Sequence, residues 1–143
     1  MANIVPFAFK GELASGTHNF ASGGDSFKIA LYTSNPYTTS STAFDATNEV
    51  SSSSGSNYPS EGKALTSQTV TATTATTAID FADTTFASAT FTAAFAAIYN
   101  TSASNKLCVV LDFGGNKTAT NGTFTISYPD PSTPSNAIIS ITS

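Results

Sequence analysis

The residues of this chain that could carry out acid–base or nucleophilic chemistry are few and widely spaced. His18 is the only histidine among the 143 residues. A catalytic triad or a metal site would need several partners to converge on His18, and its sequence neighbour Glu12 supplies only one. We therefore expect His18 to lie at the surface or in a loop, outside any catalytic site.

Cys108 is the only cysteine, and one thiol cannot close a disulfide within the chain. It lies in the apolar run 107–111, which predicts a small buried side chain. A reactive thiolate needs a histidine or a cation beside it, and the sequence makes neither evident for Cys108. We therefore interpret Cys108 as a core residue.

Three aspartates are the remaining candidates for chemistry: Asp80, Asp83 and Asp112. Paired carboxylates can cleave glycosides, but carbohydrate sites usually add aromatic platforms, and the chain has no tryptophan. Residues three apart on a strand point to opposite faces, which separates Asp80 from Asp83. A calcium site would need six or more oxygen ligands, and the spacing does not require one. We expect these aspartates to cap turns, and we predict no catalytic, cofactor-binding or metal-binding residues and no enzymatic activity.

The segment Gly114-Gly115-Asn116-Lys117 matches part of a phosphate-binding loop. It lacks the full glycine-to-lysine spacing and a helix after it. Glycine and asparagine at these positions instead predict a hairpin turn, and Asn121-Gly122 predicts a second one.

The composition excludes several classes of partner. Charged residues make up only 10% of the chain, whereas Ser and Thr fill about a third of it. All cations are lysines, the net charge is −4, and no basic cluster occurs, so we expect no nucleic-acid binding. No apolar run approaches the ~20 residues that span a bilayer, so we expect no membrane partner. The first residues also lack the basic leader of a signal peptide.

Short alternating segments dominate the rest of the chain. In 26–33, Phe27, Ile29 and Leu31 alternate with side chains predicted to face outward. In 106–113, we expect Leu107 and Val109 on one face and Cys108 on the other, with both faces covered. Segment 86–100 has helical propensity around its alanines, but its alternating aromatics favour a strand. The other predicted strands are 65–71, 78–81, 123–128 and 137–142.

The sum is six to eight short strands separated by Gly, Pro and Asn, and it predicts an all-β protein. We expect one domain over 1–143, an antiparallel β-sandwich of jelly-roll-like or Ig-like type. Residues 1–24 would form an N-terminal arm, with a short helix or turns over 4–14 and Pro6 in its first turn. Residues 25–143 would form the sandwich, interrupted by a long polar loop over 37–62. That loop is too polar to pack by itself, and the sequence leaves open whether it is functional or disordered.

Three groups of segments occur in order along the chain. The first is GTHNF (16–20) with DSFKIALYTS (25–34), the second is TNEV (47–50) with GSNY (55–58) and GKALT (62–66), and the third is AIYN (97–100) with VLDFG (110–114) and NGTFTI (121–126). Together they resemble a family of small virion structural proteins of tailed bacteriophages. The resemblance covers most of the chain, is looser around 51–54, and implies neither a cofactor nor catalytic residues.

The resemblance implies a protein of the virion, assembled in the host cytoplasm. We expect a capsid cement or decoration protein that binds the major capsid protein and copies of itself, as a dimer or trimer. Size, strand pattern, low charge and the adaptable loop favour this role, and the arm 1–20 and the loop 37–62 are the expected contacts. A tail, baseplate or head–tail connector component is the alternative, and a glycan-binding adhesin is the third hypothesis.

Overall fold

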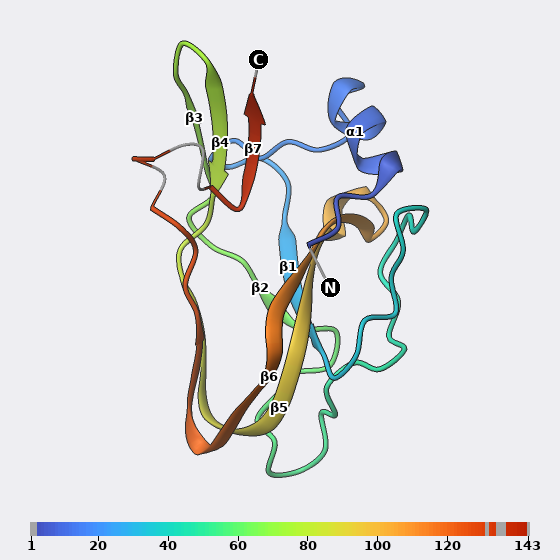
Figure 1. Cartoon of the computed structure of the whole chain (residues 1–143), viewed down its shortest axis with the longest axis vertical. Coiled ribbons are helices and arrows are strands. Elements are labelled where there is room, and N and C mark those ends of the chain that lie inside the picture. The colour runs from blue at the N-terminus through green and yellow to red at the C-terminus, as the bar shows by residue number, and fades with distance from the viewer. Residues whose placement is uncertain (1–2, 131, 134–136, 143) are drawn as a thin grey trace.

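The computed structural model describes residues 3–130, 132–133 and 137–142, and it confirms an all-β sandwich with one short helix (Figure 1). Both sheets are antiparallel, with strand orders β2-β1-β5-β6 and β3-β4-β7. The elements are α1 (Phe7–Ala14), β1 (Phe27–Tyr32), β2 (Lys63–Ala64), β3 (Thr69–Ala72), β4 (Thr76–Asp80), β5 (Thr84–Asn100), the 3₁₀ turn η1 (Thr101–Ala103), β6 (Lys106–Ile126) and β7 (Ile139–Thr142).

β5 and β6 form one long bent ribbon, and this differs from the prediction. We expected two strands over 106–113 and 123–128 with hairpin turns between them, but β6 runs without interruption through both. Phe95 pairs with Asp112 and Ala93 pairs with Lys117. Between these two pairs β5 advances by two residues, whereas β6 advances by five. The excess forms a large bulge around Gly114-Gly115. Bulges bend a ribbon without ending it, which explains why turn-forming residues occur inside a strand.

A second bulge decides which way Cys108 points. Ile98 pairs with Val109, whereas the next residue, Tyr99, pairs with Leu107, which leaves Cys108 as the extra residue. Cys108 and Val109 therefore both face the core between the sheets, and Leu107 faces the other side. The expected faces of this strand were wrong at this point, although its burial on both sides is confirmed.

The loop 37–62 covers the outer face of the four-stranded sheet. Tyr37 and Phe44 from this loop join a second apolar cluster with Tyr32, Tyr99 and other side chains of that face. Tyr32 is consequently fully buried, although alternation predicted that it faces outward. The loop has few aliphatic residues, but its aromatic residues pack on the sheet and Val50 joins the main core.

The N-terminal arm is built into the sandwich. The helix α1 falls within the predicted range 4–14, and Pro6 precedes it as the N-cap residue. Ile4 bridges to Val110 at the edge of β6, and Phe9 and Phe20 are buried in the main core. Within the described ranges, no helix is long and apolar enough to cross a membrane.

Candidate functional site

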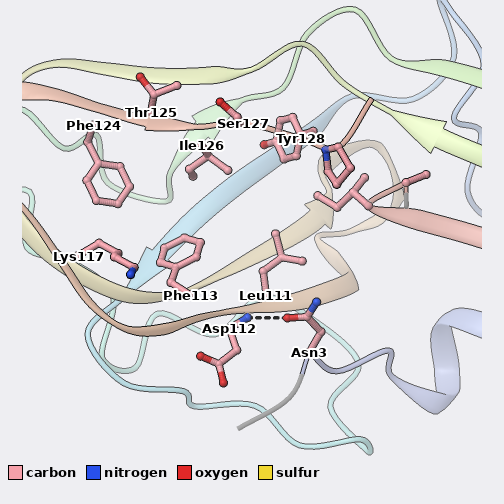
Figure 2. A pocket seen from close by; sticks show the side chains of 13 residues that line it. Asn3, Leu111, Asp112, Phe113, Lys117, Phe124, Thr125, Ile126, Ser127 and Tyr128 are labelled. Atoms are coloured by element: carbon pink, nitrogen blue, oxygen red, sulfur yellow. Dashed lines mark hydrogen bonds between the residues drawn. The ribbon is translucent and has the colours of Figure 1, made fainter. Parts of the chain in front are cut away.

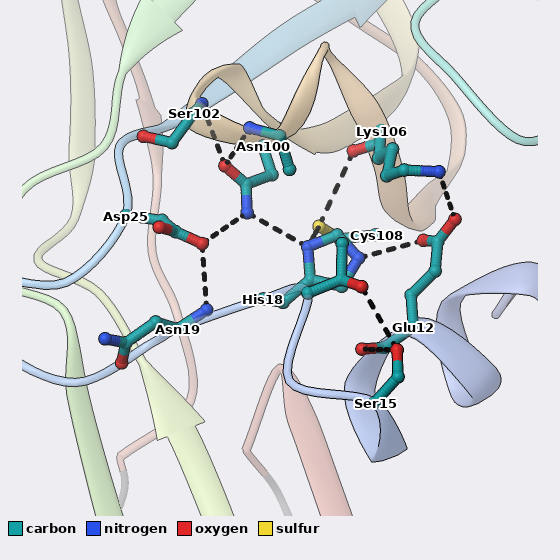
Figure 3. A network of polar contacts seen from close by, with 11 residues as sticks. Glu12, Ser15, His18, Asn19, Asp25, Asn100, Ser102, Lys106 and Cys108 are labelled. Carbon is teal, nitrogen blue, oxygen red and sulfur yellow. Dashed lines mark hydrogen bonds and ion pairs between the residues drawn. The ribbon is translucent and has the colours of Figure 1, made fainter.

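His18 lies at the centre of a buried polar network that ties the N-terminal arm to the β5–β6 turn (Figure 3). It is only 5% exposed, so the expected surface position was wrong, although His18 does lie in the loop between α1 and β1. Its ring lies 5.2 Å from that of Phe9 and 6.1 Å from that of Phe20, measured between centroids. These aromatic residues exclude water from the imidazole and leave its two nitrogens to be satisfied by protein groups.

The two ring nitrogens of His18 have different partners. Nε2 lies 2.9 Å from Oε2 of Glu12, and Nδ1 lies 3.0 Å from Nδ2 of Asn100. The other carboxylate oxygen of Glu12, Oε1, accepts a 2.7 Å hydrogen bond from Nζ of Lys106. The same Asn100 nitrogen donates to Oδ2 of Asp25 over 2.8 Å. The network thus joins α1, the segment after it, and both ends of the β5–β6 turn.

Asn100 determines the tautomer of His18. Oδ1 of Asn100 accepts hydrogen bonds from the backbone N–H groups of Ser102 and Ala103, at 2.9 and 3.2 Å. The amide nitrogen of Asn100 must therefore be the group that faces His18, and it can only donate. Nδ1 of His18 is then an acceptor, and Nε2 carries the proton that is donated to Glu12.

Cys108 also lies beside His18, with Sγ 3.9 Å from Nδ1. The sequence did not reveal this proximity, because the two residues are 90 positions apart. Two features oppose a reactive thiolate. Nδ1 already accepts a hydrogen bond from Asn100, and burial, with the charges of Glu12 and Asp25, raises the pKa of the Cys108 thiol well above its usual range. The geometry places a cysteine and a histidine together without activating the sulfur.

The carboxylate of Glu12 is held in its charged form. Burial opposes ionisation of this group, but hydrogen bonds from Lys106 and His18 and the charge of Lys106 outweigh it, and the pKa of Glu12 is lowered. Asn100, Lys106 and Asp25 were not predicted as members of any site. One signal was present for Asn100, since an asparagine just before a predicted turn is a preferred cap residue.

The three candidate aspartates do not form a common site. Asp83 accepts hydrogen bonds from Oγ of Ser127 and the backbone N–H of Tyr128, both at 3.0 Å, and so fastens the chain after β6. Asp112 lies in the other arm of β6 and accepts from the backbone N–H of Gly114 over 2.8 Å. Burial, together with the charges of Asp83 and Asp130, raises the pKa of Asp80. In the described part of the chain, no group of three or more His, Cys, Asp or Glu residues could hold a metal ion.

Tyrosine hydroxyls hold the loop 37–62 in place. The hydroxyls of Tyr32 and Tyr37 lie 2.7 Å apart, and Tyr32 donates to the backbone carbonyl of Asp45 over 2.9 Å. The hydroxyl of Tyr58 accepts from the backbone N–H of Leu31 and donates to Oε1 of Glu49, at 2.9 and 2.8 Å. Burial raises the pKa of Tyr32 and Tyr58 well above their usual range, so both hydroxyls stay protonated and able to donate. The loop is ordered by this chain itself.

An apolar cleft of about 560 Å³ opens between the two arms of β6 (Figure 2). Leu111 and Phe113 line one wall, and Phe124 and Ile126 line the other. Leu111 and Phe113 also pack against the main core, so the cleft is the open side of the sandwich. Such walls suit an apolar side chain better than a reacting group.

A second groove, of about 810 Å³, lies between α1 and β7. Val5 and Leu13 from the N-terminal arm and Ile139 and Ile141 from β7 line it. Val5 and Ile141 belong to the few large apolar side chains that are exposed in the described residues.

Comparisons of this chain with protein-family models, curated proteins and solved structures found no match.

Proposed function

We propose that this protein is a non-enzymatic structural component of a phage virion, a cement protein that binds the outer surface of the capsid and stabilises it. The observation that carries the proposal is the use of the polar network. Of the residues best suited to chemistry, His18 and Cys108 are buried and Glu12 is partly buried. The hydrogen bonds of His18 and Glu12 fasten the arm to the sheet. The segments that resemble virion proteins support the same role, and capsid subunits are the proposed partner.

The N-terminal arm supplies a contact surface for that partner. Phe7 is 67% exposed although it opens a helix whose next aromatic residue, Phe9, is buried in the core. An exposed aromatic side chain on a firmly anchored segment is a typical anchor of a protein interface. Because Phe9 and Glu12 hold the arm in place, a deletion of the arm would damage the fold, and a point substitution is the sharper test.

The test compares the occupancy of capsids by Phe7→Ser and by Val70→Ser. Val70 is also an exposed apolar residue, but it lies on β3, remote in sequence from the arm. We expect Phe7→Ser to weaken binding to capsids that lack the protein by roughly tenfold, which corresponds to about 1.4 kcal/mol. Val70→Ser should bind as the unmodified chain does. Equal occupancy by all three proteins would contradict a contact through the arm.

A further inference from the structure

The three-stranded sheet ends at β7, whose outer edge pairs with no strand among the described residues. β7 pairs with β4 through Ile139 and Ile141, and no other described segment forms a backbone hydrogen bond to it. Natural proteins usually blunt such edges with charged side chains, proline or bulges. β7 (Ile-Ser-Ile-Thr) has none of these. By contrast, Ile4 covers the edge of β6 at Val110.

Beside this edge lies the groove of about 810 Å³ between β7 and α1. Ile141, 48% exposed, and Val5, 43% exposed, face this groove with nothing packed over them among the described residues. The opposite sheet has four strands and this one has three. One further strand beside β7 would equalise the two sheets and cover both side chains.

The groove selects its occupant by width and by charge. The helix α1 forms its far wall, so a strand that is followed by further strands of a folded sheet, as in a second copy of this chain, would meet the helix (Figure 1). A single extended segment avoids this obstacle. Lys10 is the charged residue that lines the groove, and it forms no ion pair with any described residue.

We propose that the groove between β7 and α1 is the docking site for one extended strand of a partner protein. The strand pairs with the free edge of β7 through main-chain hydrogen bonds, places apolar side chains against Ile141 and Val5, and carries an acidic side chain toward Lys10. The inference deepens the proposed cement role, on which the identity of the donor as a capsid subunit rests.

The test attaches a donor strand to the full chain, so that weak affinity cannot hide the effect. A short glycine-containing turn and a seven-residue strand of alternating valine and threonine are appended after the last residue. Such a strand runs antiparallel to β7 and can pair only along its free edge. We expect the midpoint of thermal unfolding to rise by about 4 °C or more, and the amides of Ile139–Thr142 to exchange more slowly with deuterium.

Two matched substitutions locate the effect. Ile141→Lys in the fused chain should abolish the rise, whereas Val70→Lys, at the opposite edge of the same sheet and 47% exposed, should retain it. At low salt, a donor strand with glutamate at both ends should raise the midpoint of thermal unfolding more than a donor strand with lysine at both ends. In a fused chain that carries Lys10→Glu, the lysine donor should give the larger rise. No rise in the fused chain, an equal response of the two variants, or indifference to the end charges would overturn the proposal.

The oligomeric state of the unfused chain completes the test. We expect the oligomeric state measured by light scattering to be the same with and without Ile141→Lys, because any dimer or trimer would form through another surface. A dimer that this substitution dissociates would assign the groove to a second copy and overturn the partner strand. These measurements need no capsid, so their failure is distinguishable from a failure of the cement role, which the number of copies in the particle tests.

Discussion

At the scale of single residues, Asn100 holds the buried network together. Its side chain is fully buried and satisfies four groups: two backbone donors of η1, the ring of His18 and the carboxylate of Asp25. A buried polar group without a partner is costly, and removal of one asparagine here leaves several groups unpaired at once. Asn100 therefore links the position of the arm to the turn between the two longest strands.

We expect Asn100→Ala to lower the free energy of unfolding by about 2–4 kcal/mol, because it removes a cap, leaves Nδ1 of His18 without its amide donor, and takes from Asp25 one of its two donors. Asn116→Ala is the matched control, since Asn116 is exposed on β6. Urea unfolding monitored by tyrosine fluorescence measures both. If the two variants lose the same free energy of unfolding to within about 0.5 kcal/mol, the network is energetically unimportant.

Glu12 makes the same network sensitive to acid. Its pKa is lowered in the folded protein, so its ionised form stabilises the fold above the ordinary glutamate pKa of about 4.3. That contribution is lost as the pH falls through the lowered value. Unfolding measured from pH 7 to about pH 3 should show an advantage of the unmodified chain over Glu12→Gln that is constant near neutrality and disappears in acid.

The control for this pH series is Glu61→Gln. Glu61 is exposed, and its Oε2 lies 3.9 Å from Nζ of Lys28. Its difference from the unmodified chain should be small throughout, as for other surface ion pairs. A Glu12→Gln profile that runs parallel to the unmodified profile down to the lowest pH would refute the proposed role of the Glu12 charge.

At the scale of elements, glycines and bulges shape the sheets. Gly62 stands just before β2 with φ +82°, and a Cβ there would lie 2.1 Å from the backbone oxygen of Ile29. β2 is only two residues long and reaches β1 by this close approach. Gly55 has a similar φ of +93° with open space around it. Gly55 and Gly62 therefore share a left-handed backbone conformation, but only at Gly62 would a Cβ collide with the backbone of β1.

This pair separates strain from collision. Gly55→Ala should cost about 1–2 kcal/mol, the penalty of a left-handed conformation for a residue with a Cβ. Gly62→Ala should cost more than about 4 kcal/mol, because backbone atoms must also move. Chemical denaturation of both variants measures the difference. Equal losses would mean that β2 and β1 do not need this approach.

The same elements show how far sequence reasoning reaches. Alternation correctly placed β1 and favoured a strand over a helix for β5, because side-chain period two is a local property. It failed at Gly114-Gly115 and at Cys108, because a bulge and a turn draw on the same residue types and only pairing with β5 distinguishes them. The meeting of His18 with Cys108 could not be predicted, since it depends on the register of segments far apart in the sequence.

At the scale of the whole molecule, the buried polar side chains hold segments of the fold together. The arm, the loop 37–62 and the sheets are fastened by the His18 network and the tyrosine hydroxyls. Only 10% of the residues are charged, so long-range steering contributes little, and short-range contacts must dominate any assembly. A sparsely charged sandwich with an anchored arm suits many weak contacts repeated over a regular shell.

The proposed role as a capsid cement protein is tested most directly by the number of copies of this chain in purified particles of the phage that is proposed to carry it. Quantitative mass spectrometry against the major capsid protein gives that number without any assumption about the site of binding. A cement protein that covers the shell predicts hundreds of copies in each particle. About a dozen copies, as a single symmetric ring at one vertex would contain, or no copies at all, would contradict the cement role.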